Sequence, residues 1–242
     1  MDNKKYDVSV LVDGCGQLGI TLNERQVEDF ITYYEYLIEI NKVMNLTGIT
    51  EFNEVMLKHF VDSLSIVKVM DIEKIDTLID VGTGAGFPGF PLKIAFPHLK
   101  VVLLDSLNKR VRFLNEMTEK LNYNGIECIH GRAEELAKNK KYREKFDLCV
   151  SRAVANLASL SEYCLPFVKV GGDFVSYKSA DIETEMKNAK KAINILGGRI
   201  ADKKDFLLPD SDIGRSLVVI HKDKITNMKY PRKAGIPTKE PL

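Results

Sequence analysis

One stretch of the sequence combines residue types that suit cofactor chemistry. Residues 78–89 read LIDVGTGAGFPG, so a short apolar run leads into a turn with glycines at positions 82, 84 and 86. Glycine lacks the Cβ atom that would keep a ligand away from the backbone. A glycine-rich turn at the carboxyl end of the first strand of an open α/β sheet is typical of a nucleotide-like cofactor site.

Two cofactor classes fit this turn. Gly84, Gly86 and Gly89 satisfy GxGxxG, the fingerprint of dinucleotide-binding proteins. Gly82, Gly84 and Gly86 satisfy the GxGxG turn of S-adenosylmethionine-dependent methyltransferases, here introduced by Asp80. The glycines alone leave both alternatives open.

Acidic residues after the next two predicted strands favour the methyl donor. Asp105 ends the run VVLLD, 19 residues after Gly86, where a carboxylate would accept hydrogen bonds from ribose hydroxyls in either class. Glu134 follows the third strand, where methyltransferases commonly contact the adenine amino group. None of the nine tyrosines has a lysine four residues on, and no GxxxxGK phosphate loop is present. The sequence therefore favours a methyltransferase over a short-chain dehydrogenase or a P-loop enzyme.

Charge is distributed unevenly along the chain. Residues 1–74 hold 7 Lys and Arg against 13 Asp and Glu, whereas residues 75–242 hold 28 against 21. Residues 223–242 contain five of these basic residues and three prolines, which predicts an extended basic tail without regular helix or strand. The positive second part favours a polyanionic partner.

The elements that must position these residues divide into two zones. Residues 22–44 predict an amphipathic helix with Thr21 and Glu24 as a capping box, and residues 52–70 predict a second helix capped by Thr50. From residue 76 onward β-rich runs alternate with helical patterns, which predicts βαβ units and a parallel sheet covered on both faces. The predicted strands are 77–81, 101–105, 126–130, 146–151, 173–178 and 217–222, and the helices between them are 89–96, 107–122, 155–168 and 181–196.

Composition excludes several protein classes. Apolar residues make up 45% of the 242-residue chain, but no apolar run is long enough for a transmembrane helix. The N-terminus lacks the apolar run and cleavage site of a signal peptide. None of the four cysteines stands in a CxxC motif, so we expect neither a disulfide framework nor a structural metal site, and we expect reduced thiols in a cytoplasmic protein.

Seven motifs in order show a family resemblance. They are NLTGIT (45–50), KHFVDSL (58–64), DVGTGAGFPGFPLKI (80–94), LLDSLNKRVRFL (103–114), GRAEEL (131–136), SRAVANL (151–157) and YPRKAGIPTKEP (230–241). Together they closely resemble the RsmG (GidB) family, the guanine-N7 methyltransferases of bacterial small-subunit ribosomal RNA. The resemblance runs from about residue 20 to the C-terminus. Its most specific parts are Arg152 after the fourth strand and the YPRK tail.

The resemblance implies a class I S-adenosylmethionine-dependent methyltransferase fold, Rossmann-like, with a seven-stranded, mostly parallel sheet. It implies a helical extension over residues 1–74, a methyltransferase core over 75–222 and a basic tail over 223–242, packed on or near the RNA site. The implied partner is small-subunit ribosomal RNA or the small ribosomal subunit. Nothing in the sequence suggests an obligate dimer, so we expect a monomer, and we expect neither a metal nor a membrane as a partner. The cofactor residues implied are Gly82, Gly84, Gly86, Phe87, Asp105, Ser106, Leu107, Ala133, Glu134 and Arg152.

Guanine chemistry sets what such a site must do. The N7 atom of guanine already has an in-plane lone pair, so we expect no dedicated general base and a reaction that depends on proximity and orientation. Arg152 is the predicted catalytic residue, contacting the guanine carbonyl or an adjacent phosphate. We expect His59 to be a satisfied, partly buried histidine. The residues predicted to bind RNA phosphates are Lys178, Arg232, Lys233 and Lys239.

Three other functions remain open from the residues alone. One is an RNA-binding ribosome-assembly factor that keeps a cofactor pocket. Another is a methyltransferase that acts on a small molecule or a protein, although such an enzyme does not need a basic tail. The third is an NAD-dependent oxidoreductase of a family without the Tyr-x-x-x-Lys pair.

Overall fold

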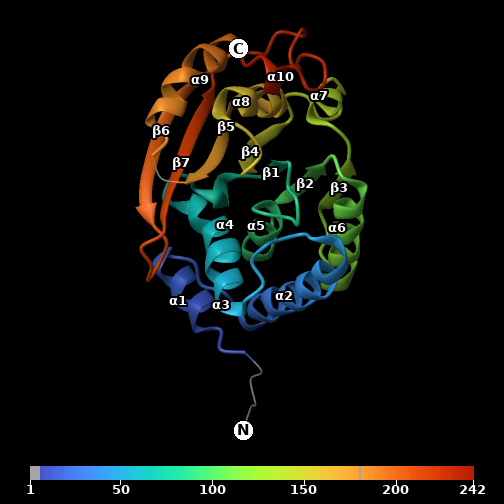
Figure 1. The fold of residues 1–242 in the computed structure, drawn as a ribbon, viewed down its shortest axis with the longest axis vertical. Helices are drawn as coiled ribbons and strands as arrows, with labels where there is room; N and C mark the ends of the chain where they lie inside the picture. Colours follow the sequence, from blue (N-terminus) through green and yellow to red (C-terminus); the bar gives the residue numbers. More distant parts are fainter. Residues whose placement is uncertain (1–5, 180) are drawn as a thin grey trace.

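A single twisted sheet organises the computed structural model, which describes residues 6–179 and 181–242. Its strand order is β3-β2-β1-β4-β5-β7-β6; β1 to β5 run parallel, while β7 is antiparallel to both of its neighbours (Figure 1). The strands are β1 Thr77–Val81, β2 Lys100–Asp105, β3 Ile126–His130, β4 Phe146–Arg152, β5 Val168–Ser179, β6 Gly198–Leu207 and β7 Gly214–Lys222. The predicted mostly parallel, seven-stranded fold is therefore confirmed.

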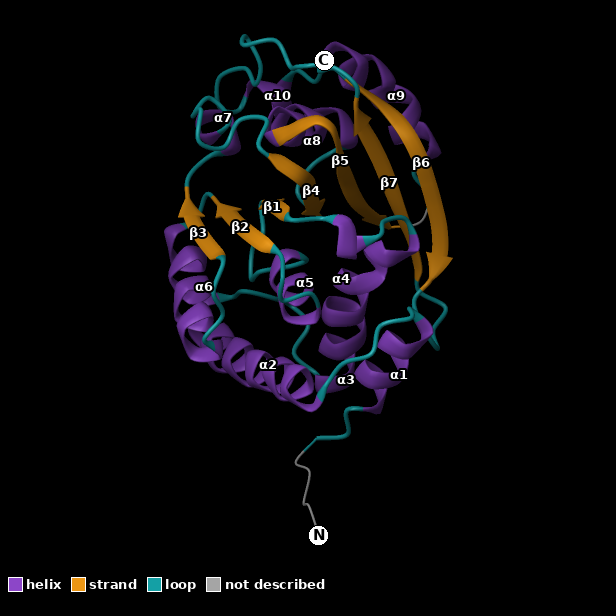
Figure 2. Cartoon of the chain, turned by 180° about the vertical axis from the view of Figure 1, so that it is seen from behind, coloured by secondary structure: helices purple, strands orange, loops and turns teal. Residues whose placement is uncertain are grey.

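Helices cover both faces of this sheet (Figure 2). One face carries α1 Ser9–Gln17, α2 Glu24–Met44, α3 Phe52–Val55, α4 Asp62–Leu64, α5 Gly89–Ala95 and α6 Asn108–Leu121; the other carries α7 Ala133–Leu136, α8 Leu157–Cys164, α9 Glu183–Ile195 and α10 Ile236–Lys239. Successive strand residues point to opposite faces. Leu78 and Leu148 accordingly join the core under the first set of helices, and Ile79 and Cys149 join the core under the second.

The N-terminal helices form a full layer of the molecule. Phe30, Tyr33 and Phe60 are completely buried and belong to the same hydrophobic core as Leu78 and Val150 of the sheet. No strand precedes residue 77 within residues 6–76, as the sequence predicts. The amphipathic pattern of residues 22–44 therefore buries its apolar side directly against the sheet and its following helices.

The predicted helix over residues 52–70 is interrupted. It consists of α3, a π-helical turn at Met56–Val61, α4 and a 3₁₀ turn at Ser65–Lys68. A π-turn inserts one extra residue per turn and is frequent at functional sites. Here the turn carries Lys58 and His59 to the edge of a cavity.

Both predicted helix caps are wrong by one or two residues. Asn23, not Thr21, caps α2: its side chain accepts a hydrogen bond from the Gln26 amide at 2.9 Å, and the Gln26 side chain accepts one from the Asn23 amide at 2.9 Å. The Glu51 carboxylate, rather than Thr50, accepts from the Glu54 amide at the start of α3. Several polar residues at each site can cap, and the backbone path selects among them.

β6 was absent from the predicted strands. It lies at the edge of the sheet, and a bulge interrupts its pairing with β7 between Ile200 and Asp202. Asp202 and Lys204 of this strand are exposed. Charged side chains on an edge strand discourage its pairing with other chains. The apolar run that marks the central strands is therefore missing here.

The C-terminal residues pack against the body of the protein instead of extending from it. We call residues 223–242 the C-terminal strap. Tyr230 and Pro237 are buried, and the Arg143 guanidinium donates to the backbone carbonyls of Tyr230 at 3.0 Å and Thr226 at 2.7 Å. The expectation of an extended tail without regular structure is wrong, because these contacts fix the strap and α10 forms within it.

Two further features concern the whole described chain. No helix within residues 6–179 and 181–242 is long and apolar enough to cross a membrane. All four cysteines are free thiols, and burial raises the pKa of Cys15 to about 12 and that of Cys128 to about 11.

Candidate active site

A cleft opens at the carboxyl ends of β1 to β4. Its lining comes from the loops that follow these strands and from α8: Val81, Gly82, Leu104, Asp105, Ser106, Gly131, Arg132, Ala133, Glu134, Val154 and Tyr163. The cleft thus brings together five predicted cofactor residues, namely Gly82, Asp105, Ser106, Ala133 and Glu134. A crevice at this edge is where open α/β sheets bind ligands.

The first two glycines of the loop line the hollows at this edge of the sheet: Gly82 lines the cleft, and both Gly82 and Gly84 line an adjoining cavity. Gly82 has φ +74°, and a Cβ atom there would lie 2.6 Å from Cγ2 of Val154. Gly84 has φ +63°, and a Cβ atom there would meet no protein atom within 4 Å. Both backbone conformations favour glycine. The free space beside Gly84 leaves room for a ligand against the backbone, which fits a nucleotide-like cofactor.

The third glycine rests on the N-terminal layer. Gly86 has φ +102°, and a Cβ atom would lie 2.3 Å from the hydroxyl oxygen of Tyr33. That hydroxyl donates a hydrogen bond to the carbonyl of Ala85, and Tyr33 is completely buried. Helix α2 therefore supports the glycine loop from inside the core.

Asp80 fixes both ends of the loop. Its Oδ2 atom accepts hydrogen bonds from the Thr83 hydroxyl at 2.7 Å and from the Gly89 amide at 2.8 Å. Within the described residues Oδ1 has no hydrogen-bond partner. Burial raises the pKa of Asp80 to about 7, and the hydrogen bonds from Thr83 and Gly89 oppose this rise. The carboxyl group is an internal brace for the turn.

Asp105 links β2 to the same loop. Its Oδ2 atom accepts from the Gly84 amide at 2.9 Å, and its Oδ1 atom accepts from the Leu107 amide at 2.8 Å. The Arg110 guanidinium lies 3.3 Å from Oδ2. The carboxylate is therefore oriented at the cleft wall. Ser106 beside it also lines the cleft, whereas Leu107 is 44% exposed and lies outside the lining.

Glu134 stands at the other end of the cleft. Its side chain is buried, and Oε1 accepts a hydrogen bond at 3.1 Å from the amide of Gly235 in the C-terminal strap. Tyr163 of α8 lines the cleft nearby, and its hydroxyl lies 2.7 Å from that of Thr238. The strap therefore reaches the wall of the cleft.

A second cavity adjoins the cleft at Gly82. It is lined by the glycine loop, the π-helical turn, the ends of β4 and β5, and the start of β7; among its residues are Thr47, Lys58, His59, Asp62, Gly82, Gly84, Phe87, Arg110, Arg152, Tyr177, Lys178 and Arg215. Predicted residues Phe87, Arg152 and Lys178 thus meet here. The two hollows share the turn that the sequence identifies as the cofactor loop.

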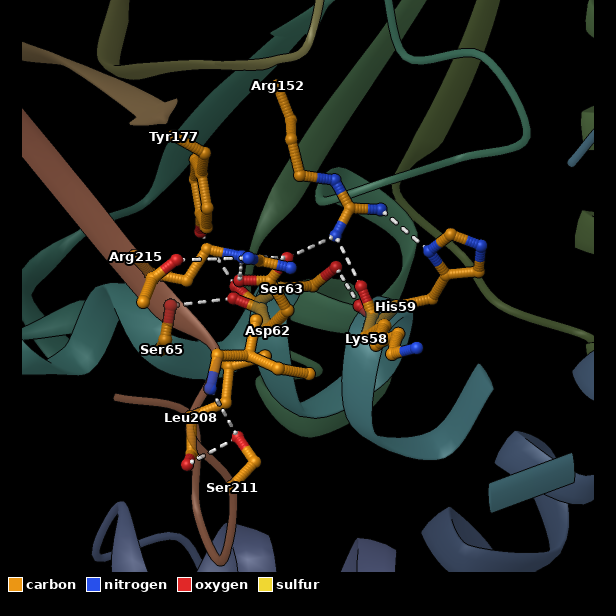
Figure 3. A network of polar contacts seen from close by, with 12 residues as sticks. Lys58, His59, Asp62, Ser63, Ser65, Arg152, Tyr177, Leu208, Ser211 and Arg215 are labelled. Carbon is orange, nitrogen blue, oxygen red and sulfur yellow. Dashed lines mark hydrogen bonds and ion pairs between the residues drawn. The ribbon is translucent and has the colours of Figure 1, made fainter. Parts of the chain in front are cut away.

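Asp62 lies at the centre of a charge cluster in this cavity (Figure 3). Its Oδ2 atom lies 3.0 Å from Nη1 of Arg152, and Nε of Arg215 donates to Oδ1 at 3.1 Å and to Oδ2 at 3.2 Å. The Asp62 side chain is 4% exposed. One buried carboxylate therefore orients two guanidinium groups that come from different strands.

His59 completes the cluster as a neutral group. Its Nδ1 atom lies 3.3 Å from Nη2 of Arg152, and its Nε2 atom lies 2.8 Å from the Thr47 hydroxyl. Burial, followed by repulsion from Arg152, lowers the pKa of His59 to about 3. Arginine only donates, so Nδ1 accepts and Nε2 carries the proton. The ring stacks on Phe87 with centroids 4.5 Å apart. His59 has the satisfied, partly buried state expected from the sequence.

The four predicted RNA-binding residues lie in two places. Lys178 lines the second cavity and donates to the Ala155 carbonyl at 2.8 Å and to Glu185 at 2.6 Å. Arg232 is paired at 2.7 Å with Glu162, which is completely buried, so its charge already has a structural partner. Lys233 and Lys239 of the strap are exposed. The RNA contacts of all four stay predictions.

Asp62 and Arg215 are the site residues that sequence reasoning missed. The motif KHFVDSL contains Asp62, but nothing in its spacing indicates that it pairs with arginines. Arg215 starts an antiparallel strand and belongs to no recognised motif. The pair is separated by 153 residues, so only the folded structure brings it together.

Three features define a class I S-adenosylmethionine-dependent methyltransferase. They are the strand order, the glycine turn after β1, and the acidic residue at the end of β2 that this turn contacts. Two similar solved structures agree. The Methanococcus jannaschii fibrillarin pre-rRNA processing protein has a TM-score of 0.52 at 20% identity, covering 66% of this chain and 73% of that one. The StiE O-MT structure has a TM-score of 0.53 at 16% identity, covering 68% and 74%. These likenesses show the fold alone.

The family model described as rRNA small subunit methyltransferase G (GidB) matches residues 26–208. The protein of that name from Lachnoclostridium phytofermentans is 53% identical over 236 residues, 98% of each chain. Its namesake from Acetivibrio thermocellus is 51% identical over 243 residues, 100% of each chain. The chain belongs to the rRNA small subunit methyltransferase G family, and it is an enzyme that uses S-adenosylmethionine.

Proposed function

We propose that this enzyme transfers the methyl group of S-adenosylmethionine to the N7 atom of a guanine in small-subunit ribosomal RNA. Family membership supports the RNA substrate and the methyl donor. The observation that carries the proposal is the cavity beside the cofactor cleft, since a buried carboxylate there holds two arginines next to the glycine loop. An anionic, oxygen-rich partner such as RNA suits fixed guanidinium groups.

The residues of the cleft fit the cofactor that the family implies. The open space at Gly84 suits a ligand that lies against the backbone. The carboxylate of Asp105 and the buried Glu134 suit a ligand with hydroxyl and amino donors. When bound, S-adenosylmethionine supplies an electrophilic methyl group. The residues that would hold it are Gly82, Gly84, Gly86 and Phe87 in the loop, Asp105, Ser106 and Leu107 at the ribose, and Ala133 and Glu134 at the adenine.

The proposed reaction requires no general base from the protein. Guanine N7 has a free lone pair and loses no proton when it is methylated. His59 is the histidine that lines the second cavity, and both of its ring nitrogens are engaged, by Arg152 and Thr47. The protein contributes by holding the reacting atoms in line, which is catalysis by proximity and orientation.

Arg152 is the proposed catalytic residue, and Asp62 is a positioning residue that acts through it. Asp62 and the Lys58 carbonyl, 3.2 Å from Nη1, orient the guanidinium, which lies over the Phe87 ring at 5.1 Å. Held in this way, Arg152 can donate to the guanine carbonyl while N7 stays free for attack. The alternative target is the phosphate next to the methylated base, which arginine also binds in a fixed geometry.

RNA backbone contacts complete the proposal. Lys178 at the second cavity and the strap residues Arg232, Lys233 and Lys239 are proposed to bind phosphates. Such contacts position the RNA without reading its sequence, and each makes binding more sensitive to salt. The target base must also leave its stack, which costs least for an unpaired loop base.

The test is a methyl-transfer assay with labelled S-adenosylmethionine, offered small-subunit particles, naked ribosomal RNA and total protein in parallel. We expect the label to be recovered as 7-methylguanosine in the RNA. Arg152→Gln should abolish most of this transfer, whereas Arg112→Gln, which removes an exposed arginine of α6, should not change it. Label recovered in protein, or no label in any pool, would overturn the proposed function.

We infer in addition that the enzyme acts as a monomer in the cytoplasm and without a metal ion. Sedimentation of the purified protein with and without RNA tests this state, and the methyl-transfer assay in the presence of a chelator tests independence from metals.

A further inference from the structure

The C-terminal strap touches a residue of the cofactor cleft. We infer that the strap is a working part of the cofactor site: the Gly235 amide holds one oxygen of Glu134, so that the other oxygen is directed to the amino group of the adenine. Gly235 is thus a positioning residue that acts through Glu134. The inference rests on the proposed use of S-adenosylmethionine and assigns the selection of adenine to a contact between the strap and the cleft.

The geometry at Gly235 is specific. Its amide donates to Oε1 of Glu134 at 3.1 Å, and its φ of +82° belongs to the left-handed region that favours glycine. The Glu134 side chain lines the cleft and is 7% exposed. A buried carboxylate with one oxygen bound in this way cannot rotate freely. Its second oxygen is therefore presented in a fixed direction.

Anchors on both sides of Gly235 fix the position of its amide. On one side Arg232 pairs with the buried Glu162 of α8. On the other side the Pro237 carbonyl accepts a hydrogen bond at 2.6 Å from Ser159, and Thr238 lies 2.7 Å from the Tyr163 hydroxyl. All of these partners belong to α8, which also lines the cleft through Tyr163. The strap and the cleft wall therefore share one rigid support.

Carboxylate chemistry makes this contact selective. A fixed carboxylate oxygen accepts a hydrogen bond from an amino group and repels a carbonyl oxygen. Adenine carries an amino group at position 6, and hypoxanthine carries a carbonyl there. If the strap orients Glu134, releasing the strap must weaken binding of an adenine ligand more than binding of the matching hypoxanthine ligand. A strap that only supports the fold would weaken both equally.

The experiment measures this ratio by calorimetry with S-adenosylhomocysteine and S-inosylhomocysteine. The variants are a chain that ends at Arg232, which keeps the pair with Glu162, then Glu134→Gln, and then the two changes combined. We expect truncation to lower the affinity for S-adenosylhomocysteine about tenfold, or about 1.4 kcal/mol. The affinity for S-inosylhomocysteine should change less than about twofold on the same scale. In the Glu134→Gln background truncation should have no further effect, because both changes remove the same interaction.

A second variant tests the same contact in a full-length chain, so that the result does not depend on the folding of the truncated chain. Ser159→Ala combined with Thr238→Val keeps the full length and removes the two anchors after Gly235. It should shift the ratio in the same direction. The matched control is Ser161→Ala, since Ser161 is equally buried in α8 but bonds only to its own helix, at the Leu157 carbonyl. That control should leave both affinities unchanged.

Three results would overturn the inference: equal losses for both ligands, an unchanged affinity for S-adenosylhomocysteine after truncation, or additive losses in the combined variant. Methylation of RNA is scored separately. A full-length chain that binds S-adenosylhomocysteine but methylates no RNA would overturn the proposed function, while the affinity ratios would still decide the role of the strap.

Discussion

The two ends of the cofactor cleft are supported in different ways. The glycine-loop end rests on Tyr33 and Asp80, which are completely buried in the core. The end that we propose for the adenine rests on a hydrogen bond to Glu134 from the partly exposed Gly235 of the strap. The first support cannot fail without damage to the core, whereas the second can. We therefore expect substitutions at the glycine-loop end to lower folding stability, and substitutions at the strap to change cofactor affinity with less effect on stability.

Gly86→Ala should have the largest effect, because it strikes the buried support. The new Cβ atom would lie 2.3 Å from the Tyr33 hydroxyl, in a backbone conformation that disfavours alanine. Overpacking and backbone strain together should lower the free energy of unfolding by about 4 kcal/mol, measured by urea denaturation. Gly84→Ala is the matched control, since its Cβ atom meets no protein atom. It should cost only about 1–2 kcal/mol yet weaken cofactor binding. Equal losses of stability would contradict the proposed difference.

Asp62→Asn should have the next largest effect. It removes the charge that two arginines share, and it should destabilise the protein by about 3 kcal/mol because breaking a buried ion pair leaves its partners uncompensated. Methyl transfer should also fall, but by no more than in Arg152→Gln, because Asp62 acts through that residue. Asp71→Asn removes an equal charge from an exposed pair with Lys74 and should change neither property. A fully active Asp62→Asn enzyme would show that Arg152 needs no orientation.

The lowered pKa of His59 predicts how the stability of the protein depends on pH. Its pKa of about 3 lies below the ordinary value of 6.5, so below pH 6.5 the unfolded chain binds a proton that the native chain does not. The stability contributed by neutral His59 is present above pH 6.5 and is lost as the pH falls. Comparison with His59→Asn isolates this effect, because Asp80, whose pKa is raised to about 7, has the opposite slope in both proteins.

We expect the difference in free energy of unfolding between the native protein and His59→Asn to shrink by about 2 kcal/mol from pH 7 to pH 5. Chemical denaturation at the two pH values measures it. A difference that stays constant would mean that native His59 takes up its proton as readily as an unfolded histidine does.

The smallest expected effects come from replacing a tyrosine by phenylalanine at each end of the cleft. Tyr33→Phe removes the hydroxyl that donates a hydrogen bond to the Ala85 carbonyl. It should lower the free energy of unfolding by about 1.5 kcal/mol, because the carbonyl left without this bond is buried. Tyr163→Phe removes the hydroxyl that meets the exposed Thr238 and should cost about 0.5 kcal/mol. Urea denaturation of both variants measures the contrast. A larger loss at Tyr163 would reverse the proposed order of the two supports.

Much of the sheet could be predicted because its central strands are buried on both faces. Such strands read as continuous apolar runs, and the predicted bounds of the central strand β1 match the observed ones. β6 lacks this signal, since it is an edge strand with many charged side chains. The strap was missed for a related reason. Its prolines and lysines predict irregular chain, and only its distant contacts with Arg143 and Glu162 show that it is ordered.

The candidate site also has one part that the sequence predicts and one part that it does not. Gly82 and Glu134 follow predicted strands and Asp105 ends one, and parallel strands bring their carboxyl ends to one edge of the sheet. Their meeting in one cleft therefore follows from local pattern and topology. The pairing of Asp62 with Arg152 and Arg215 joins a helical turn to two strands far along the sequence. No periodicity or spacing encodes such a contact.

The position of the N-terminal layer has a consequence for how the chain is made. Chains leave the ribosome from the N-terminus, so α1 to α4 emerge before any strand of the sheet. Their buried face packs in one core with Val219 of β7, which is synthesised near the end. The nascent chain therefore carries an apolar helical surface through most of its translation. Cotranslational folding of this layer must wait for the sheet, and chaperones that bind exposed apolar helices have their longest opportunity here.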